Sequence, residues 1–289
     1  MTRIARLFFS TTLFAGLVLS GASVAASAKA VPPAAKIELW RLDCGEIAFR
    51  DMSFFSDTFA YSGESRTLTD SCYLIRHGSD FMLWDTGLSE TVLGAKIDPA
   101  APFSMRLEES LTSQLSKLGV TPDRIGRIGI SHNHFDHVGQ AASFPAATLM
   151  MGAADLAQFK ADPLPFGVDP ALIKPWLGDG AKVDAITGDR DVFGDGSVTI
   201  LSMPGHTPGE TSLLVRLRDT GPVLLSGDVV HFEAQIEHRG VPPFNFDRAE
   251  TLASMERLEG IARTLKATVV IGHDPDHIGR LPAFPASAK

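Results

Sequence analysis

The chain has 289 residues, of which 44% are hydrophobic and 21% are charged, and its formal net charge is −8 at pH 7. That length and apolar fraction allow one large or two small domains with a sizeable core. The acidic balance argues against nucleic acid and an anionic membrane surface as partners, although it says little about a neutral small molecule.

The first 30 residues have the order of a secretory signal peptide. Arg3 and Arg6 give a basic start, an apolar run covers residues 7–19, and small residues at 26–30 offer cleavage sites. The apolar run is shorter than the roughly 20 residues that cross a bilayer. Cleavage would remove three cations and no acid, so the net charge would become −11. We therefore expect residues 1–30 to be a signal peptide and the protein to be periplasmic or secreted, with an uncleaved anchor as the alternative.

Hydrophobic periodicity predicts a mixed α/β chain. In the first half, strands are expected at residues 37–42, 71–76, 80–84, 125–130 and 148–151. Four leucines at helical spacing predict a helix over residues 106–118, and a short helix is expected at 153–160. In the second half, strands are expected at 198–202, 212–216, 223–225 and 268–271, and a long helix at 249–265. The proline-rich segment 162–176 reads as an inserted loop or lid.

The two cysteines, Cys44 and Cys72, have two open interpretations. An exported protein could pair them in a disulfide. Alternatively, two buried thiols could pack as small apolar groups, and this is the state that we favour.

Four side chains that suit a metal ion follow the strand at residues 125–130. They are His132, His134, Asp136 and His137. Three imidazoles and a carboxylate so close together would repel one another or lose hydration unless something neutralised them. A metal ion does so, because neutral imidazole and carboxylate are good ligands for zinc and its neighbours. The alternative is a polar surface loop that carries histidines by chance.

Together with three later motifs, this cluster resembles the signature of the metallo-β-lactamase superfamily. The later motifs carry His206 in Pro-Gly-His-Thr-Pro-Gly, Asp228 in Ser-Gly-Asp, and His273 in Ile-Gly-His-Asp. The resemblance covers residues 39–273. It implies an α/β fold in which a four-layer αβ/βα sandwich holds a metal site at one edge between two mixed sheets. Residues 31–289 would then form a single catalytic domain.

The resemblance also implies a site for two divalent metal ions. One ion would take His132, His134 and His206, the other would take Asp136, His137 and His273, and Asp228 would bridge them. Zinc is the default, although cobalt, manganese or iron would suit such ligands. Two ions of this kind hold an ionised hydroxide at neutral pH and polarise a carbonyl or phosphoryl oxygen, so the implied reaction is hydrolysis.

Two carboxylates would have further roles by the same resemblance. Asp136 could take the proton from the attacking hydroxide and pass it to the leaving oxygen. The superfamily places an Asp under the metal site, where it orients a ligand histidine, and Asp85 would have this role. A strand-end Asp that only makes a turn bond is the alternative for Asp85.

Within the superfamily, the flanking segments look most like those of the N-acyl homoserine lactonases. These segments are residues 42–45, 72–75, 83–87 and 131–139. This branch implies opening of the lactone ring of N-acyl homoserine lactones (quorum quenching) by a metal-bridging hydroxide. Many such lactonases carry a Tyr three residues after the bridging Asp, where this chain has His231. We expect His231 to donate a hydrogen bond to the substrate carbonyl instead, with an exposed loop histidine as the alternative.

A lactone with an acyl tail needs an apolar groove. Apolar residues on segments expected around the mouth of the site are its candidates, although core or interface packing would explain any one of them equally well. They are Phe54, Phe55, Phe103, Met105, Phe166, Trp176, Phe244 and Phe246.

Other activities on this scaffold stay open. An exported phosphotriester or aryl-ester hydrolase would carry the same seven ligands, whereas exported metallo-β-lactamases usually depart from the Asp228 pattern. A binding protein that had kept only the fold would be expected to lose ligand positions. The expected partner is a small lactone or ester, with neither nucleic acid nor a membrane. The sequence leaves open the acyl-chain length, the metal in the cell and the oligomeric state, a homodimer included.

Overall fold

The computed structural model describes residues 35–289, which pack as one unit. The expected signal peptide lies outside the described residues and stays a prediction. Between residues 35 and 289, no helix combines the length and the apolar character that a membrane crossing requires.

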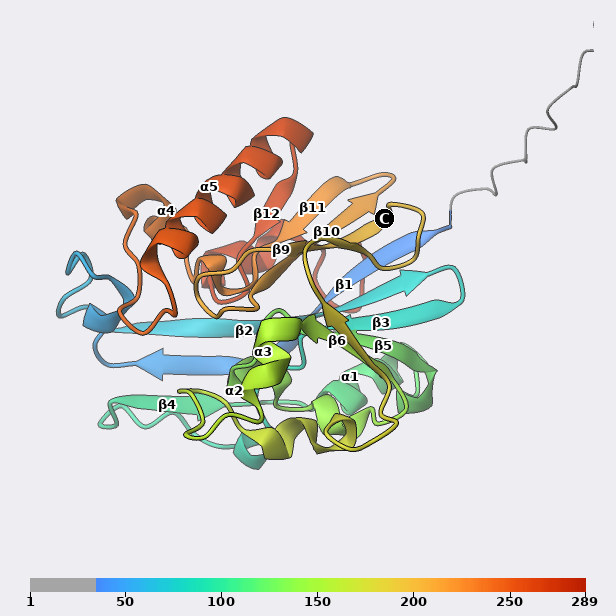
Figure 1. The fold of residues 1–289 in the computed structure, drawn as a ribbon, viewed down its shortest axis with the longest axis horizontal. Helices are drawn as coiled ribbons and strands as arrows, with labels where there is room; N and C mark the ends of the chain where they lie inside the picture. The colour runs from blue at the N-terminus through green and yellow to red at the C-terminus, as the bar shows by residue number, and fades with distance from the viewer. Residues whose placement is uncertain (1–34) are drawn as a thin grey trace, which may run out of the picture. The chain divides into compact units, whose positions relative to one another are not determined.

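Two β-sheets form the centre of the fold (Figure 1). The larger sheet has the order β4-β1-β2-β3-β5-β6-β7, and the smaller one β12-β11-β10-β9-β8. Strands β4, β1, β2 and β3 pair antiparallel, β3, β5, β6 and β7 pair parallel, and β11 and β12 form a parallel pair. The larger sheet comprises β1 (Ile37–Phe49), β2 (Arg66–His77), β3 (Asp80–Trp84), β4 (Phe103–Arg106), β5 (Ile125–Gly129), β6 (Thr148–Gly152) and β7 (Val183–Ile186). The smaller sheet comprises β8 (Arg190–Asp191), β9 (Val198–Ser202), β10 (Thr211–Leu217), β11 (Gly221–Leu225) and β12 (Thr268–Val270).

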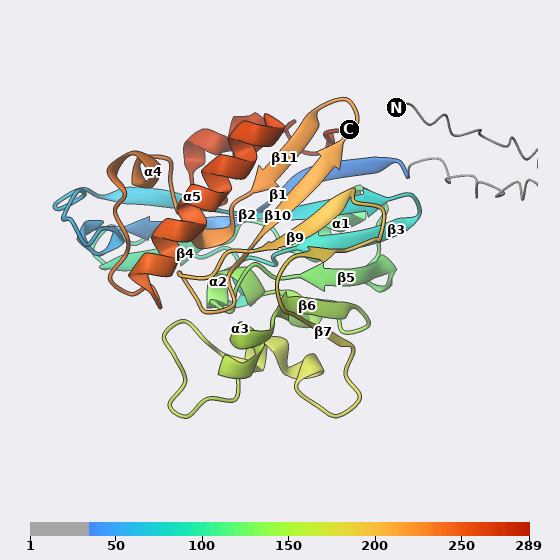
Figure 2. The same cartoon turned by 45° about the horizontal axis from the view of Figure 1, so that its top comes forward.

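Helices cover the outer faces of both sheets. Helices α1 (Leu111–Lys117), α2 (Phe135–Val138) and α3 (Ala153–Gln158) lie on the side of the larger sheet (Figure 1). Helices α4 (Ala234–His238) and α5 (Arg248–Leu265) lie on the other side, and Figure 2 shows α5 running in much the same direction as β10 and β11 of the smaller sheet. Short 3-10 turns join the elements: Ser53–Phe55, Glu90–Val92, Pro122–Arg124, Ala141–Ser143, Pro170–Trp176, Gly227–Val229 and Pro275–Arg280.

Alternation along the strands explains the layers. On β2, Tyr73 and Ile75 face the smaller sheet and join the core between the sheets, whereas Leu74 faces the opposite way, into the core under α1. On the smaller sheet, Leu213 lies between the sheets and Leu214 packs under α5. Each sheet is therefore buried on both faces, and the predicted four-layer αβ/βα sandwich is confirmed.

The predicted helix at 106–118 is wrong at its start. Arg106 belongs to the edge strand β4, and α1 begins only at Leu111, because the Ser110 side chain caps it by accepting the N–H of Ser113. Leu107 is fully buried although it is not helical. The leucine spacing therefore predicted correctly that these residues are buried, but it predicted the wrong first residue for the helix.

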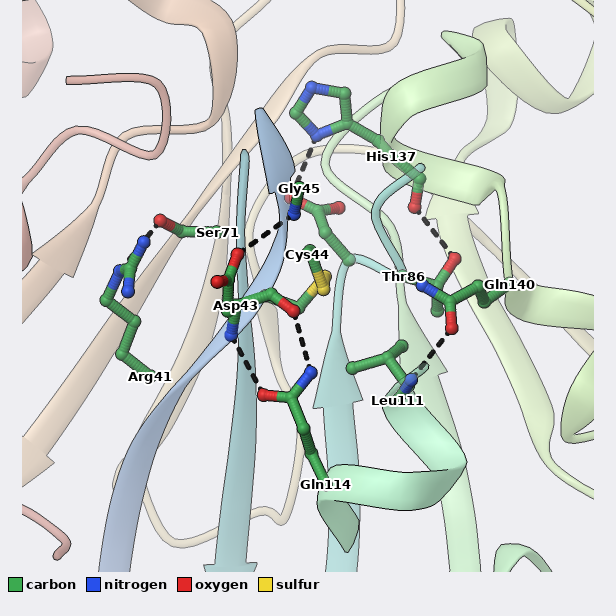
Figure 3. The surroundings of a disulfide bond; sticks show 12 residues. Arg41, Asp43, Cys44, Gly45, Ser71, Thr86, Leu111, Gln114, His137 and Gln140 are labelled. Carbon is green, nitrogen blue, oxygen red and sulfur yellow. Dashed lines mark hydrogen bonds and ion pairs between the residues drawn. A yellow bond between two sulfur atoms is a disulfide. The ribbon is translucent and has the colours of Figure 1, made fainter. Parts of the chain in front are cut away.

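The two cysteines form a disulfide, so the preference for free thiols is wrong (Figure 3). β1 and β2 are antiparallel neighbours, and a bulge between Asp43 and Gly45 brings Cys44 to a Cα–Cα distance of 5.7 Å from Cys72. The Gln114 amide fastens this bulge, since it accepts the N–H of Asp43 and donates to its carbonyl. The disulfide packs behind the turn after β3, where a Cβ on Gly87 would lie 2.3 Å from that of Cys44. That turn also holds Asp85.

Candidate metal centre

The loops that follow four strands meet at one edge of the two sheets. β5 leads into the loop and helix that carry residues 132–137, β9 leads to His206, β11 to Asp228 and β12 to His273. The ends of these strands bring together all seven ligands that the resemblance implies.

The first group of ligands has the spacing of a tetrahedral site. Nε2 of His206 lies 3.2 Å from Nε2 of His132 and 3.0 Å from Nδ1 of His134. Zinc–nitrogen bonds of 2.0–2.1 Å at tetrahedral angles place ligand atoms roughly 3.3 Å apart. These three nitrogens therefore fit one divalent ion.

The second group lies beside the first, with Asp228 between them. Nε2 of His273 is 3.2 Å from Nε2 of His137 and 3.7 Å from Oδ2 of Asp136. Oδ1 of Asp228 lies 3.3 Å from Nε2 of His273, whereas Oδ2 lies 3.7 Å from Nε2 of His206. Each oxygen of Asp228 thus faces one group, which fits a carboxylate that bridges two ions. The assignment of each side chain to an ion stays a prediction.

The protonation of the two groups differs. Burial lowers the pKa of His132 and of His206 well below the usual range, and it lowers the pKa of His134 to about 4. Burial lowers the pKa of His273, but the neighbouring Asp228 carboxylate raises it by more, so that the pKa is about 10. Burial thus favours neutral imidazoles in the first group, whereas the neighbouring carboxylates favour protonated imidazoles at His137 and His273 in the second.

Asp85 lies beside the ring of His137. Its Oδ1 accepts the N–H of Ser131 at 2.7 Å, and its Oδ2 is 3.1 Å from Nδ1 of His137. Asp85 adopts a φ of 56°, which is uncommon for a residue with a side chain. Its contacts therefore reach beyond a local turn bond to the ring of His137, and the role of orienting that ring stays a prediction.

Three further groups lie against the rings of candidate ligands and were missed in the sequence. Oε2 of the buried Glu210 lies 3.2 Å from Nδ1 of His132, and Oδ1 of Asn245 lies 2.9 Å from Nδ1 of His206. The carbonyl of Thr69 lies 2.7 Å from Nδ1 of His273. Only Glu210 had a sequence signal, because it directly follows the motif around His206.

Two buried aspartates near the site were also missed. Asp155 ties the ligand loops together, since it accepts the hydroxyl of Thr207 and the N–H groups of Gly209 and Asn133. Its burial raises its pKa to about 6. Asp70 is fully buried, and neither of its oxygens has a hydrogen-bond partner among residues 35–289. Neither residue stands in a motif that would single it out.

A large apolar cavity of about 700 Å³ opens onto the ligands. Its wall includes the metal-ligand candidates His134, Asp136, His206, Asp228 and His273. Five of the expected pocket residues line it: Phe54, Phe55, Phe103, Phe166 and Phe244. Ile47, Phe49, Leu68, Phe135 and Pro243 also line it and were not expected.

Three expected pocket residues lie elsewhere. Trp176 is buried in the core under the larger sheet, where its indole N–H donates to the carbonyl of Ala147. Met105 is half-buried on the edge strand β4 and forms no part of the wall, and Phe246 is largely exposed. The proline-rich segment packs mainly on the core, so only Phe166 and Gly167 reach the cavity. An apolar residue on a loop does not reveal which side the loop turns toward.

His231 lies inside the site. Its exposed fraction is only 4%, and its Nε2 is 3.2 Å from Oδ2 of Asp228. It lines the cavity between the ligands and the ring of Phe55, which meets it edge-on at 5.1 Å. The alternative of an exposed loop histidine is therefore wrong, and the donor role stays a prediction.

The profile of the metallo-β-lactamase superfamily matches residues 67–273. The chain belongs to this superfamily. Among curated relatives, the N-acyl homoserine lactonase AttM of Rhizobium radiobacter is 33% identical over 173 residues, which is 58% of this chain and 65% of AttM. An N-acyl homoserine lactonase of Bacillus sp is 30% identical over 232 residues, which is 77% of this chain and 88% of that protein. The alignments with the AttM relatives thus span slightly less than two thirds of their length.

Solved structures of this superfamily have the same architecture. The crystal structure of a quorum-quenching N-acyl homoserine lactone hydrolase has a TM-score of 0.73 and 25% identity, and covers 88% of this chain and 99% of that one. A dizinc quorum-quenching lactonase, AidC, has a TM-score of 0.61 at 19% identity, covers 88% of this chain and 90% of that one, and shares the fold. The predicted resemblance to the lactonase branch of the metallo-β-lactamase superfamily is confirmed by these names.

Proposed function

We propose that this protein is a dimetal hydrolase that opens the lactone ring of N-acyl homoserine lactones. One observation carries the proposal: a cavity of about 700 Å³ with mostly apolar walls is lined by five of the seven metal-ligand candidates. A small polar ring on an apolar tail matches this division, since the ring would meet the ligands while the tail lies along the phenylalanines. The names of the curated relatives support the same substrate class.

The seven side chains would hold two divalent ions, and zinc is the ion that we propose. Imidazole and carboxylate at tetrahedral spacing suit zinc, and the related AidC is described as a dizinc lactonase. When bound, such ions supply Lewis-acid activation of a carbonyl and of water.

The roles of the chain's own residues follow from their positions. Asp136 lines the cavity beside His273, so its carboxylate can take a proton from the attacking water and return it to the leaving oxygen of the ring. His231 faces the same space and would hydrogen-bond the substrate carbonyl, whose oxygen gains negative charge as the ring opens. The apolar wall fixes the acyl tail and excludes water from the rest of the cavity.

We also infer that the protein is exported to the periplasm or secreted after cleavage near residue 30. The disulfide supports this inference, because such bonds persist in oxidising compartments. Cell fractionation with mass spectrometry of the mature N-terminus tests it, and a cytoplasmic, full-length product would contradict it. A homodimer stays a prediction that light scattering can test.

The substrate is tested by steady-state kinetics on metal-replete protein. The panel contains short- and long-chain N-acyl homoserine lactones, an aryl ester, paraoxon and nitrocefin, with Asp136→Asn as the variant. We expect lactone kcat/KM above about 10⁴ M⁻¹s⁻¹ and its loss in the variant. Dominant turnover of paraoxon, the aryl ester or nitrocefin, with inert lactones, would reject the lactonase and leave a dimetal hydrolase of another substrate.

A further inference from the structure

The turn after β3 is joined by short hydrogen bonds to the end of α2, the helix that carries two candidate ligands of the second group (Figure 3). The backbone N–H and the hydroxyl of Thr86 both donate to the carbonyl of His137, at 2.7 and 2.9 Å. In return, the carbonyl of Gly87 accepts the N–H of Gly139 at 2.8 Å. Thr86 is fully buried, so any of these groups that lost its partner would stay unpaired.

The length of α2 explains why these bonds matter. The helix covers only Phe135–Val138, which is too short to pair its own carbonyl groups. In a longer helix the carbonyl of His137 would accept the N–H of residue 141, but α2 has ended before that point. The two donors of Thr86 take the place of that bond. They hold the part of the backbone from which the His137 ring reaches the second group.

The disulfide supports the same turn from its other side. The carbonyl of Cys44 accepts the N–H of Leu88 at 3.1 Å, and a Cβ on Gly87 would lie 2.3 Å from that of Cys44. Cys44 is fixed in turn by its bond to Cys72 on the neighbouring strand. A continuous set of buried contacts therefore runs from the disulfide, through the turn, to the backbone of His137.

Two rings of the first group lie against other parts of the chain. Glu210, just before β10, approaches His132, and Asn245, just before α5, approaches His206. Both neighbours are more than 100 residues beyond the turn after β3. A disturbance of that turn should therefore affect the second group more than the first.

We propose that Thr86 is a positioning residue for His137, and that the disulfide holds Thr86 in place, so that the second group keeps the spacing its ion needs. The spacing at stake is the 3.2 Å between Nε2 of His137 and Nε2 of His273. The inference rests on the two-ion part of the proposed function and is independent of the substrate.

The test compares variants of two buried threonines. Thr86→Val keeps the shape of the side chain and removes the hydroxyl, whereas Thr86→Ser keeps the hydroxyl. Thr251→Val is the matched control, because the buried hydroxyl of Thr251 also donates to a backbone carbonyl, that of Asp247 at 2.7 Å. Thr251 approaches the metal centre only through Asn245, on the side of the first group. A similar drop in Tm is expected for both valine variants, since each loses one such bond.

The readout is the affinity for each ion separately. Stepwise competition with a chelator measures both zinc affinities, and cadmium-113 NMR gives one resonance per ion, with the second ion assigned by the loss of its resonance in Asp136→Asn. Thr86→Val should weaken the second ion about tenfold and the first less than twofold. Thr86→Ser and Thr251→Val should both bind the second ion within about twofold of the wild type.

The disulfide is tested in the same assay. Cys44→Ala with Cys72→Ala should also weaken the second ion more than the first. In that background Thr86→Val should add less than about threefold, because both changes act through the same turn. If Thr86→Val does not fold, the disulfide variant alone carries the test.

The possible outcomes are distinguishable. An unchanged second ion in Thr86→Val, equal weakening of both ions, or failure of Thr86→Ser to restore the affinity would overturn the positioning role. A full tenfold effect of Thr86→Val without the disulfide would overturn the link to the disulfide. A wild type that binds a single zinc ion would overturn the two-ion proposal, whereas two bound ions with inert lactones would overturn only the lactonase.

Discussion

Oε2 of Glu210 lies 3.2 Å from Nδ1 of His132, and neither side chain is exposed. The other oxygen of Glu210 accepts the N–H of Asp228 at 2.9 Å. One buried carboxylate thus faces the ring of a candidate ligand in the first group and accepts a hydrogen bond from the backbone of the proposed bridging residue.

Glu210→Gln should weaken metal binding. The substitution replaces one of the two carboxylate oxygens with an N–H donor, so either the negative charge beside His132 or the acceptor of the Asp228 N–H is lost. We expect zinc affinity to fall about 10- to 100-fold, the usual cost of removing a group that orients a metal ligand. Competition with a fluorescent chelator measures it, with the exposed Glu237→Gln as control. Equal affinities in the two variants would contradict this role.

Gly167 offers a test of the contact between the proline-rich segment and the ligands. Its φ is +79°, and a Cβ there would lie 2.5 Å from Cδ2 of His134. Gly167→Ala should cost about 1 kcal/mol in stability from the backbone conformation. It should also lower metal affinity about tenfold by pushing the His134 ring.

Gly188→Ala is the matched control for that prediction. Gly188 has a φ of +74° with nothing within 4 Å of its added Cβ, so it should show the loss of stability alone. If both variants bound zinc as the wild type does, Gly167 would have no role in placing His134.

Because of Asp155, the free energy of unfolding should fall as the pH rises. Burial raises its pKa to about 6 in the fold from the usual 3.8, so the folded state binds its proton more tightly than the unfolded state. The stabilisation by this proton is complete below about pH 4 and is lost as the pH rises through 6.

An Asp155→Asn variant does not titrate at this position. Its unfolding free energy, measured by urea denaturation without metal, should rise relative to the wild type between pH 4 and 7, by up to about 3 kcal/mol. A constant difference between the two proteins over that range would mean that the pKa of Asp155 is not raised.

Loss of the disulfide should destabilise the fold. Cys44 and Cys72 close a loop with a sequence separation of 28 residues, and Cys44→Ala with Cys72→Ala should cost about 3–4 kcal/mol on the loop-entropy account. The bond packs behind the turn that holds Asp85, so weaker metal binding is expected as well. An unchanged midpoint of urea denaturation would show that the strand pairing alone holds this region.

Much of the fold and of the candidate site could be predicted from the sequence because the signals are local. The ligand motifs follow apolar strands, and strands that end at one edge bring their following loops together, as with His132 and His206. The apolar face of α5 was read from its period, and the helix begins at Arg248, one residue before the expected start.

The other features of the site could not be predicted. The spacing of residues along the chain does not show which way a loop or side chain points in the folded structure. Trp176 and Phe166 lie on the same proline-rich segment, yet one turns into the core and the other toward the cavity. The bulge that brings Cys44 to Cys72 needs the register of β1 against β2. The buried amide of Gln235 donates to the carbonyl of Phe55, which is 180 residues away in sequence.

The most direct measurement of the central claim is product analysis by mass spectrometry after metal-replete protein is incubated with N-hexanoyl homoserine lactone. We expect the ring-opened N-hexanoyl homoserine, one water heavier than the substrate, to form rapidly with the wild type and at the uncatalysed rate with Asp136→Asn. Unchanged lactone, or release of free hexanoic acid from the amide, would contradict a lactonase.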